Sequence, residues 1–214
     1  MAYTLKELVY TLQGEGAHAG RPAIFCRFSG CNLWSGRERD RESALCNFCD
    51  TDFIGIDGPG GGKFQSAQEL AQAIASEWKS NATNTGPRPF VVCTGGEPLL
   101  QLDKPLVDAL HLQGFEVAVE TNGTFLPPPG IDWICCSPKT AAEHVLKSGD
   151  ELKFVFPQKN IEPHEFTGLD YRHFFLQPMD GPDRDANTKL AIQYCLADPR
   201  WRVSLQIHKI LGIR

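Results

Sequence analysis

Short apolar runs alternate along the chain with segments of helical periodicity. The runs are rich in β-branched and aromatic side chains, which are typical of buried strands. They predict strands at Ala23–Phe28, Phe90–Thr94, Phe115–Glu120, Trp133–Ser137, Leu152–Phe156, Phe174–Gln177 and Val203–Ile207.

A clear helix is predicted between the first two of these strands. Ser66 and Glu69 have the spacing of a capping box, and Leu70, Ile74 and Trp78 then recur on one helical face. Further helices are predicted at Lys104–Leu112, Ala141–Lys147 and Asn187–Leu196.

Strands that alternate with helices predict parallel βαβ units. A chain of 214 residues fits one domain, residues 1–214. The set of elements is too short for a full barrel of eight repeats. The predicted fold is therefore α/β, a partial (open) βα barrel of about six parallel strands.

Net charge and the lengths of the apolar runs argue against two classes of partner, nucleic acids and membranes. The net charge is −5 and no long block of Lys or Arg occurs, which argues against a nucleic-acid partner. No apolar run approaches the roughly 20 residues of a membrane helix. The first residues have no charged–apolar–small signal pattern, so we expect a cytoplasmic protein without a membrane partner.

The cysteine content is unusual for a chain without a secretion signal. Five of the eight cysteines lie in apolar runs, where a thiol behaves as a small hydrophobic group: Cys26, Cys93, Cys135, Cys136 and Cys195. Cys31, Cys46 and Cys49 lie together in a polar segment instead. Closely spaced cysteines in a reducing compartment are typical of metal ligands or catalytic groups.

The spacing C-x14-C-x2-C is compatible with two kinds of metal centre, a structural zinc site or an iron–sulfur cluster. Structural zinc takes four protein ligands, so Cys26 or His18 would have to complete the set. A [4Fe–4S] cluster held by three cysteines would leave one iron free to bind something else. The charged residues between Cys31 and Cys46 are interpreted as a solvated surface excursion.

Polar and glycine residues follow the predicted strands, where ligands collect in parallel α/β folds. Gly95 and Gly96 follow an apolar strand and would let the backbone approach a ligand closely. The segment Asp50–Asp52, taken alone, predicts a turn or a helix cap. Glu120, at the end of another strand, is a candidate substrate contact.

Together these motifs resemble the radical S-adenosylmethionine superfamily: three cysteines after the first strand, Phe48 before the last cysteine, and Gly-Gly-Glu-Pro after the second strand. The likeness extends to the 7-carboxy-7-deazaguanine synthase family. It is carried by the motifs Tyr10–Gly16, Arg21–Cys31, Cys49–Asp52, Glu120–Gly123 and Ser137–Lys139. The superfamily's usual spacing is C-x3-C-x2-C, and the longer first interval here resembles a subset of the synthase family.

The resemblance implies a carbon–nitrogen lyase that converts 6-carboxy-5,6,7,8-tetrahydropterin to 7-carboxy-7-deazaguanine with loss of ammonia, in queuosine and 7-deazapurine biosynthesis. The implied cofactors are a [4Fe–4S] cluster, S-adenosyl-L-methionine and Mg²⁺. Cleavage of the cofactor would yield a 5′-deoxyadenosyl radical that abstracts hydrogen from C6 of the pterin. A homodimer and a flavodoxin-like electron donor are further implications.

The resemblance also implies roles for single residues. Cys31, Cys46 and Cys49 would hold the cluster, and Thr51, or alternatively Asp50, would bind Mg²⁺. The residues implied to bind S-adenosylmethionine are Phe48, Gly95, Gly96, Ser137, Lys139, Gln177, Pro178 and Asp180. Those implied to bind substrate are Leu12, Gln13, Gly14, Glu15, Arg27, Thr94 and Arg214.

Two alternatives remain at this stage. A glycyl-radical activating enzyme would share the cluster and the Gly-Gly-Glu pattern but would have to admit a polypeptide loop. Gln13, Glu15 and Arg27 favour a small polar heterocycle instead. The other alternative is a non-enzymatic zinc-binding module.

Overall fold

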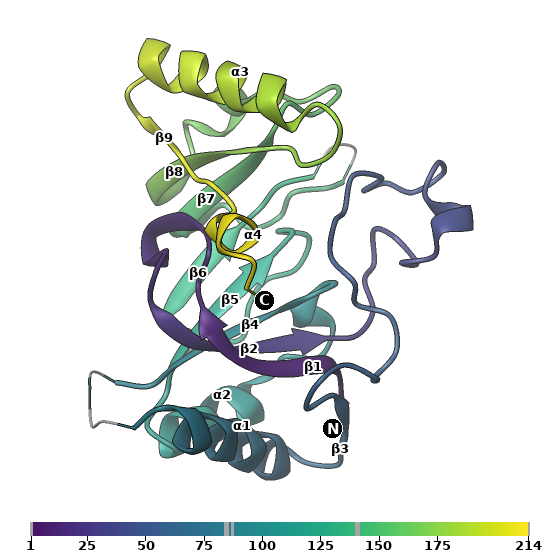
Figure 1. Cartoon of the computed structure of the whole chain (residues 1–214), viewed down its shortest axis with the longest axis vertical. Coiled ribbons are helices and arrows are strands. Elements are labelled where there is room, and N and C mark those ends of the chain that lie inside the picture. The colour runs from purple at the N-terminus through teal and green to yellow at the C-terminus, as the bar shows by residue number, and fades with distance from the viewer. Residues whose placement is uncertain (1, 84–85, 87, 140–141, 214) are drawn as a thin grey trace.

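The structure is a computed structural model that describes residues 2–83, 86, 88–139 and 142–213. One nine-stranded sheet runs through it in the order β3-β1-β2-β4-β5-β6-β7-β8-β9 (Figure 1). The strands are β1 (Tyr3–Leu12), β2 (Pro22–Phe28), β3 (Gly62–Phe64), β4 (Phe90–Gly95), β5 (Glu116–Thr121), β6 (Trp133–Cys136), β7 (Ser148–Phe156), β8 (Asp170–Pro178) and β9 (Trp201–Val203).

Most of this sheet is parallel. From β2 through β4 to β9 every neighbouring pair runs in the same direction, and only β1 is antiparallel to its neighbours β2 and β3. The order begins at β3 and ends at β9, so the sheet is not closed. The prediction of an open α/β barrel is confirmed.

Four α-helices accompany the described strands: α1 (Ala67–Asn81), α2 (Lys104–Leu112), α3 (Arg184–Ala197) and α4 (Ile207–Leu211). The predicted N-cap at Ser66 is present, but the reciprocal bond of a capping box is replaced by one from the preceding residue. Ser66 Oγ accepts from Glu69 N at 3.1 Å, and the Glu69 carboxylate accepts from Gln65 N at 2.6 Å. No helix of the described residues has both the length and the apolar character needed to cross a bilayer.

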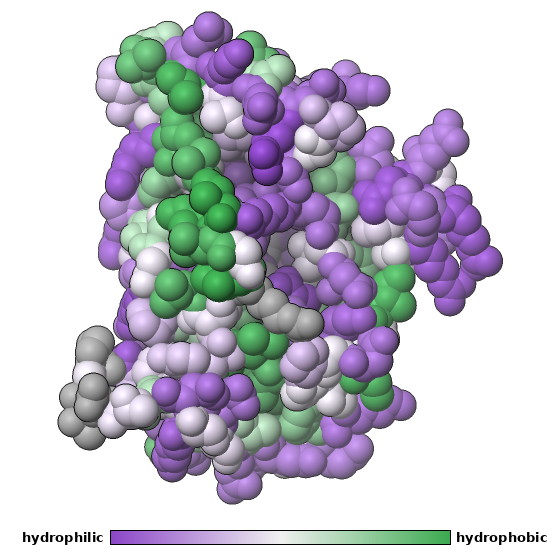
Figure 2. All heavy atoms as spheres, viewed as in Figure 1, coloured by the Kyte–Doolittle hydropathy of each residue, from purple (hydrophilic) through white to green (hydrophobic). Residues whose placement is uncertain are grey.

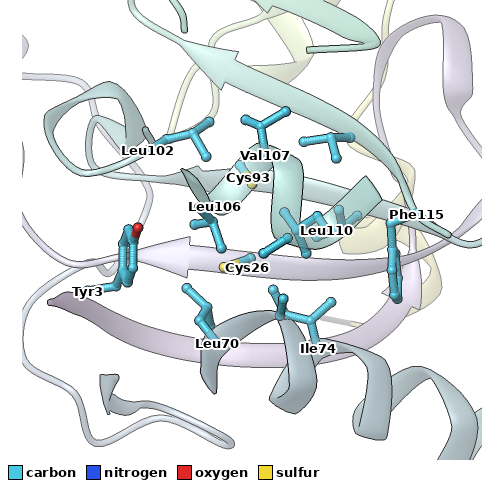
Figure 3. Close-up of a cluster of buried hydrophobic side chains, with 14 of the residues drawn as sticks. Tyr3, Cys26, Leu70, Ile74, Cys93, Leu102, Leu106, Val107, Leu110 and Phe115 are labelled. Carbon is cyan, nitrogen blue, oxygen red and sulfur yellow. The ribbon is translucent and has the colours of Figure 1, made fainter. Parts of the chain in front are cut away.

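The main hydrophobic core lies between the sheet and helices α1 and α2 (Figure 3). Leu70 and Ile74 of α1 and Leu106 of α2 are fully buried there, as are Cys26 and Cys93 from the neighbouring strands β2 and β4. A second core packs α3 against β7, β8 and β9. Because α1 and α2 cover one face of the sheet, the other face is left for a site.

On the sheet face away from α1 and α2, here called the inner face, the side chains change from apolar to polar along the strands. Ala23, Val92 and Ala118 lie toward the amino ends, where they form a small buried cluster. Arg27 and Thr94 lie toward the carboxyl ends and are register partners on β2 and β4. The inner face is thus packed at one end and polar at the other.

Two predicted elements are wrong. Val203–Ile207 is not a strand: β9 ends at Val203, and α4 begins at Ile207, whose N donates to Gly14 O at 2.9 Å. Within Ala141–Lys147, Ala141 lies outside the described residues and the rest is not helical. The backbone N–H groups of Val145 and Leu146 both donate to Gly123 O, at 2.9 and 3.1 Å, so they bind the β5 loop instead of a preceding turn.

Candidate active site

A cavity of about 630 Å³ opens at the carboxyl ends of the strands. Arg27 of β2, Thr94 of β4, Glu120 of β5, Lys153 of β7 and Gln177 of β8 all line it. In the space-filling view hydrophilic side chains border the hollow in the middle of this face above and on the right, and a strip of hydrophobic side chains lies on its left (Figure 2). Its size is in the range of pockets that hold small ligands.

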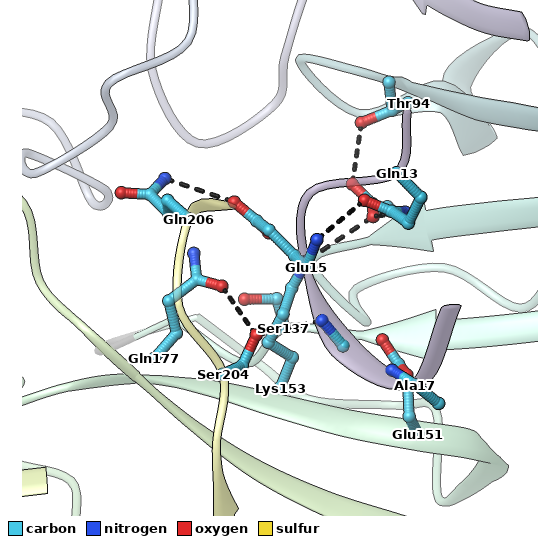
Figure 4. A network of polar contacts seen from close by, with 12 residues as sticks. Gln13, Glu15, Ala17, Thr94, Ser137, Glu151, Lys153, Gln177, Ser204 and Gln206 are labelled. Atoms are coloured by element: carbon cyan, nitrogen blue, oxygen red, sulfur yellow. Dashed lines mark hydrogen bonds and ion pairs between the residues drawn. The ribbon is translucent and has the colours of Figure 1, made fainter. Parts of the chain in front are cut away.

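A buried lysine organises the floor of the cavity (Figure 4). Lys153 Nζ pairs with Glu15 and lies 3.4 Å from Glu120 Oε1, and its side chain is 5 % exposed. Gln13 Nε2 donates to Glu120 Oε1 at 3.0 Å, and Thr94 Oγ1 donates to Glu120 Oε2 at 3.2 Å. One cation thus joins two carboxylates that come from distant parts of the chain.

This network fixes the charges of its members. Burial alone would raise the pKa of Glu120, but Lys153 and the donors Gln13 and Thr94 outweigh it and lower the pKa below its usual value. Burial would likewise lower the pKa of Lys153, yet the facing Glu120 and Glu15 raise it well above its usual value. Glu120 and Lys153 are therefore both charged near neutral pH.

Arg27 occupies the β2 side of the same cavity. Its Nε donates to Glu7 Oε1 at 2.8 Å. A guanidinium has five N–H donors in one plane. When Nε is bound to a carboxylate, the N–H groups of the two Nη atoms can still bind a second anion. The Glu7 contact orients Arg27 and leaves it suited to bind a carboxylate.

Gly95 and Gly96 form a tight backbone edge at the end of β4. A Cβ on Gly96 would lie 2.0 Å from Gly30 O and 2.9 Å from Cys31 Cβ, so the turn packs directly against the cysteine loop. Gly95 has a φ of +129°, in the region that favours glycine.

Glu97, which follows the glycine turn, hydrogen-bonds to the end of β5. It is fully buried, and its carboxylate accepts from Thr121 Oγ1 and from Asn122 N, both at 2.8 Å. Burial raises the pKa of Glu97, against the opposing effect of these donors. The contacts tie the end of β4 to the end of β5.

Gly96→Ala should disrupt this edge without unfolding the chain. The added Cβ overlaps backbone atoms, so the cysteine loop must shift, and forced overpacking costs about 1–3 kcal/mol. The sequence resemblance implies that this edge binds S-adenosylmethionine beside an iron–sulfur cluster. On that expectation, iron content after anaerobic reconstitution should fall, and S-adenosylmethionine affinity should fall by about tenfold. Gly168→Ala is the matched control, because nothing lies within 4 Å of the Cβ it would add. Equal iron content and equal affinity in the two variants would refute the close approach.

The three candidate cluster ligands come from one loop. Cys46 and Cys49 line the cavity, and Cys31 lies behind the glycine turn. The thiol of Cys46 hydrogen-bonds to Cys49, which lowers the pKa of Cys49 to about 6. A thiolate at neutral pH is the form that binds metals.

A structural zinc site would need a fourth protein ligand beside the three cysteines. The residues proposed to complete a zinc site lie elsewhere: Cys26 contacts Cys93 in the core, and His18 packs on Trp133 at 4.3 Å between ring centroids.

Lys139 lies on the β6 side of the cavity. Its Nζ donates to Ser137 Oγ at 2.6 Å and lies 5.8 Å from the centroid of the Phe48 ring. The hydrogen bond to Cys49 and burial raise the pKa of Cys46, and the charge of Lys139 opposes that rise. For Cys49, the hydrogen bond from Cys46 is the main cause of the lowered pKa, and the charge of Lys139 adds to it. Lys139 therefore brings a positive charge close to the cysteine pair.

The C-terminal segment crosses the mouth of the cavity. Lys209 Nζ bridges Asp50 and Asp180, at 2.5 and 2.6 Å, and so joins the cysteine loop to the end of β8. Gln206 Nε2 donates to Glu15 Oε1 at 3.1 Å and to Asp50 Oδ2 at 3.0 Å. In Figure 1 helix α4 lies over the sheet between the two halves of the molecule.

The structure brings nearly all of the sequence-predicted site residues to this one cavity. The lining includes Leu12, Gln13, Gly14, Glu15, Arg27, Cys46, Phe48, Cys49, Asp50, Thr51, Thr94, Gly95, Gly96, Ser137, Lys139, Gln177, Pro178 and Asp180. Cys31 is outside the lining, and Arg214 lies outside the described residues.

Sequence reasoning missed several lining residues. Among them are Lys6, Glu7, Lys153, Gln206, His208 and Lys209. Lys153 carried a usable signal, since Glu151 and Lys153 alternate with the apolar Leu152 and Phe154, which places the charged side chains on the face opposite the core.

An open, mostly parallel α/β barrel with a polar cavity at its strand ends, lined by Cys46 and Cys49, has the architecture of an α/β enzyme. No protein-family model matches the chain. The chain does match named relatives and a solved structure.

The chain is 62% identical over 213 residues to the 7-carboxy-7-deazaguanine synthase of Bordetella pertussis and 59% identical over 213 residues to that of Caulobacter vibrioides, with 100% of each chain covered in both cases. The crystal structure of QueE from Escherichia coli matches with a TM-score of 0.70 and 28% sequence identity, over 97% of this chain and 95% of that one. The chain belongs to the 7-carboxy-7-deazaguanine synthase family.

This membership confirms the predicted family and enzyme class, a lyase of the queuosine pathway. The family implies a radical S-adenosylmethionine cluster together with S-adenosylmethionine itself, and a small-molecule pterin substrate fits its activity. The two sequence alternatives, a glycyl-radical activating enzyme and a zinc-binding module, do not describe this family.

Proposed function

We propose that the cavity converts 6-carboxy-5,6,7,8-tetrahydropterin to 7-carboxy-7-deazaguanine with loss of ammonia. The observation that carries this proposal is the placement of Arg27, Gln13 and Glu15 in one cavity with Cys46 and Cys49. A planar heterocycle with a carboxylate needs a guanidinium, amides and a carboxylate that converge on it. The cavity supplies all three kinds of group beside the thiols.

At the cluster end, Cys31, Cys46 and Cys49 would hold the [4Fe–4S] cluster, and S-adenosylmethionine would bind beside it. The cluster and cofactor, when bound, supply a carbon-centred radical. The Gly95–Gly96 backbone edge binds the amino group of the methionine moiety, Ser137 and Lys139 meet the carboxylate and ribose, and Phe48 meets the adenine through its backbone. The remaining contacts on the adenine side are Gln177, Pro178 and Asp180.

At the substrate end, the hydrogen-bonded residues around Lys153 orient the pterin. Gln13 and Glu15 are already held in place, by Glu120 and by Lys153 and Gln206, so little freedom is lost on binding. Leu12, Gly14 and Thr94 complete the wall, and Arg27 binds the substrate carboxylate. Holding the pterin in one pose would reduce the entropic cost of the reaction at its C6 position.

A magnesium ion at Thr51 belongs to the same proposal. Thr51 and Asp50 both line the cavity, but Asp50 is already paired with Lys209. The Thr51 hydroxyl together with substrate oxygens suits a hard cation such as Mg²⁺. Asp50 is the alternative ligand.

The family resemblance supports three further assignments: a homodimer, a flavodoxin-like electron donor and a cytoplasmic location. For the homodimer, exposed apolar side chains on α3 and α4, among them Leu196 and Ile210, offer area that a second copy can cover. We also propose that residues 1–214 form one domain. The terminal carboxylate of Arg214 is proposed to reach the substrate.

The function is tested by anaerobic incubation of the reconstituted chain with 6-carboxytetrahydropterin, Mg²⁺, reductant and S-adenosylmethionine. Mass spectrometry should detect 7-carboxy-7-deazaguanine and one ammonia per product. Cleavage of S-adenosylmethionine without any ring-contracted product would overturn the proposed substrate.

Arg27→Ala should separate substrate binding from cofactor cleavage. Loss of a charge-assisted pair costs about 1.5–3 kcal/mol, so kcat/KM for the pterin should fall by about 10- to 150-fold. Slow uncoupled cleavage of S-adenosylmethionine should persist, because Arg27 is not proposed to touch the cofactor. Both products are quantified by liquid chromatography.

Arg21→Ala is the matched control for that experiment. Arg21 precedes the same strand and pairs with Glu116 at 2.7 Å, with both side chains 24 % exposed, but it does not line the cavity. Its kcat/KM should remain near the wild-type value. If Arg27→Ala behaves like Arg21→Ala, Arg27 does not bind the substrate carboxylate.

A further inference from the structure

The segment between Cys31 and Cys46 stands out from the body of the molecule and its outer surface is hydrophilic (Figures 1 and 2). Sequence alone suggested a solvated excursion, but one of its charges is turned inward. Arg41 stacks over the ring of Trp34, with its Cζ 4.1 Å from the ring centroid, and its side chain is 30 % exposed.

The platform beneath Arg41 is fixed. Trp34 is 7 % exposed, its Nε1 donates to Arg37 O at 3.2 Å, and its ring meets Phe53 edge-on at 5.6 Å between centroids. Phe53 is itself 2 % exposed. The stacked guanidinium therefore has a rigid partner and a defined plane.

Arg41 also binds the backbone that carries two of the cluster ligands. Its Nη1 donates to Asn47 O and to Cys49 O, both at 3.0 Å, and its Nε donates to the Glu38 carboxylate at 2.9 Å. These two carbonyls belong to the residues on either side of Phe48 in the Cys46–Cys49 turn. One side chain from the inserted loop thus clasps the C-x-x-C turn.

We propose that Arg41 is a positioning residue of the iron–sulfur site: it fixes the Cys46–Cys49 turn and places a positive charge behind it. This inference rests on the proposed cluster. Bonds from a cation to two carbonyls hold both thiolates in the orientation for cluster binding and reduce the freedom of the turn. The inserted loop therefore has a role at the site.

The charge has a second consequence. Reduction of the cluster adds one negative charge. The Glu38 carboxylate that pairs with Arg41 is 78 % exposed, so water screens it, and the guanidinium still stabilises the reduced state and raises the reduction potential. Loss of Arg41 should release iron faster and also make the cluster harder to reduce. A residue that only maintained the fold would not alter the potential of the cluster that remains bound.

The test compares Arg41→Gln with Arg39→Gln in the full chain after anaerobic reconstitution. Arg39 lies in the same loop, is 72 % exposed and pairs only weakly with Asp40 at 3.5 Å, so it matches the change in charge without the clasp. Iron release to a chelator and the midpoint potential, the latter by redox titration followed by electron paramagnetic resonance, are measured for both.

Arg41→Gln should release iron about tenfold faster than wild type, the factor that corresponds to about 1.4 kcal/mol, and its potential should shift to a more negative value. Arg39→Gln should match wild type in both. Arg41→Lys keeps the charge but not the two-carbonyl reach, so it should recover the potential more fully than the retention of iron. Equal release and equal potential in the two Gln variants would overturn the proposal, while a wild-type chain that assembles no cluster would overturn the proposed function instead.

Discussion

Cys46→Ala is expected to remove the cluster and to abolish both cleavage of S-adenosylmethionine and product formation. Three thiolates leave one iron open, and removal of one of them leaves a cluster with two protein ligands and no defined coordination site. Iron content, the visible absorption of the cluster and product formation measure the loss.

Cys195→Ala is the control for the chemical change. Cys195 lies on α3, against the second core and away from the cavity lining. Its removal should leave iron content and turnover at wild-type values, and circular dichroism should report the same fold for both variants. A Cys46→Ala protein that retained its iron or its activity would contradict the ligand assignment.

Lys153→Met should produce the largest loss of stability. Methionine keeps the approximate length of the side chain but leaves Glu15 and Glu120, which are 14 % and 21 % exposed, without their cation. Removing one partner of a buried ion pair costs about 3–5 kcal/mol. Urea denaturation should show a fall in the free energy of unfolding of about 3 kcal/mol, and turnover should be lost because Gln13 and Glu15 lose their fixed positions.

Two comparisons separate this effect from the mere loss of a lysine. Lys104→Met breaks an exposed pair with Asp108, with side chains 56 % and 53 % exposed, and should change stability by no more than about 0.5 kcal/mol. The double variant Lys153→Met/Glu120→Gln removes one uncompensated charge and should recover part of the loss. A Lys153→Met protein as stable as Lys104→Met would show that Lys153 does not compensate the buried carboxylates.

Much of the fold could be predicted because its strands are buried on both faces. Continuous apolar runs such as Phe90–Thr94 signal a central strand whatever the details of packing. The N-terminal strand β1 was missed for a physical reason. A bulge between Leu5 and Glu7 shifts its register by one residue, so the buried positions Leu5 and Leu8 do not keep the two-residue period.

The errors near the C-terminus have a different cause. Val203, Leu205 and Ile207 alternate like a strand, but Leu205 is 41 % exposed and the chain leaves the sheet after β9. Ile207 instead binds Gly14, a contact between residues nearly two hundred positions apart. Local periodicity carries no information about such a contact, and for the same reason Gln206, His208 and Lys209 could not be predicted as cavity residues.

The candidate site was predictable to the extent that its residues sit in compact motifs. Gln13–Glu15, the C-x-x-C turn and Gly95–Gly96 each read as a unit, and all of them line one cavity. The charge network could not be predicted, because Lys153 joins Glu15 and Glu120 only through the curvature of the sheet. The clasp of Arg41 on the cysteine turn was hidden in the same way, within a run of charges that looked solvated.

The central claim is that Cys31, Cys46 and Cys49 hold a [4Fe–4S] cluster with one iron open to S-adenosylmethionine. Electron paramagnetic resonance of the anaerobically purified, reduced chain, recorded before and after S-adenosylmethionine is added, tests it most directly. We expect about four iron atoms per chain and a [4Fe–4S]⁺ signal that changes when S-adenosylmethionine binds. A colourless protein that contains zinc but no iron, or a cluster signal that S-adenosylmethionine leaves unchanged, would contradict the claim.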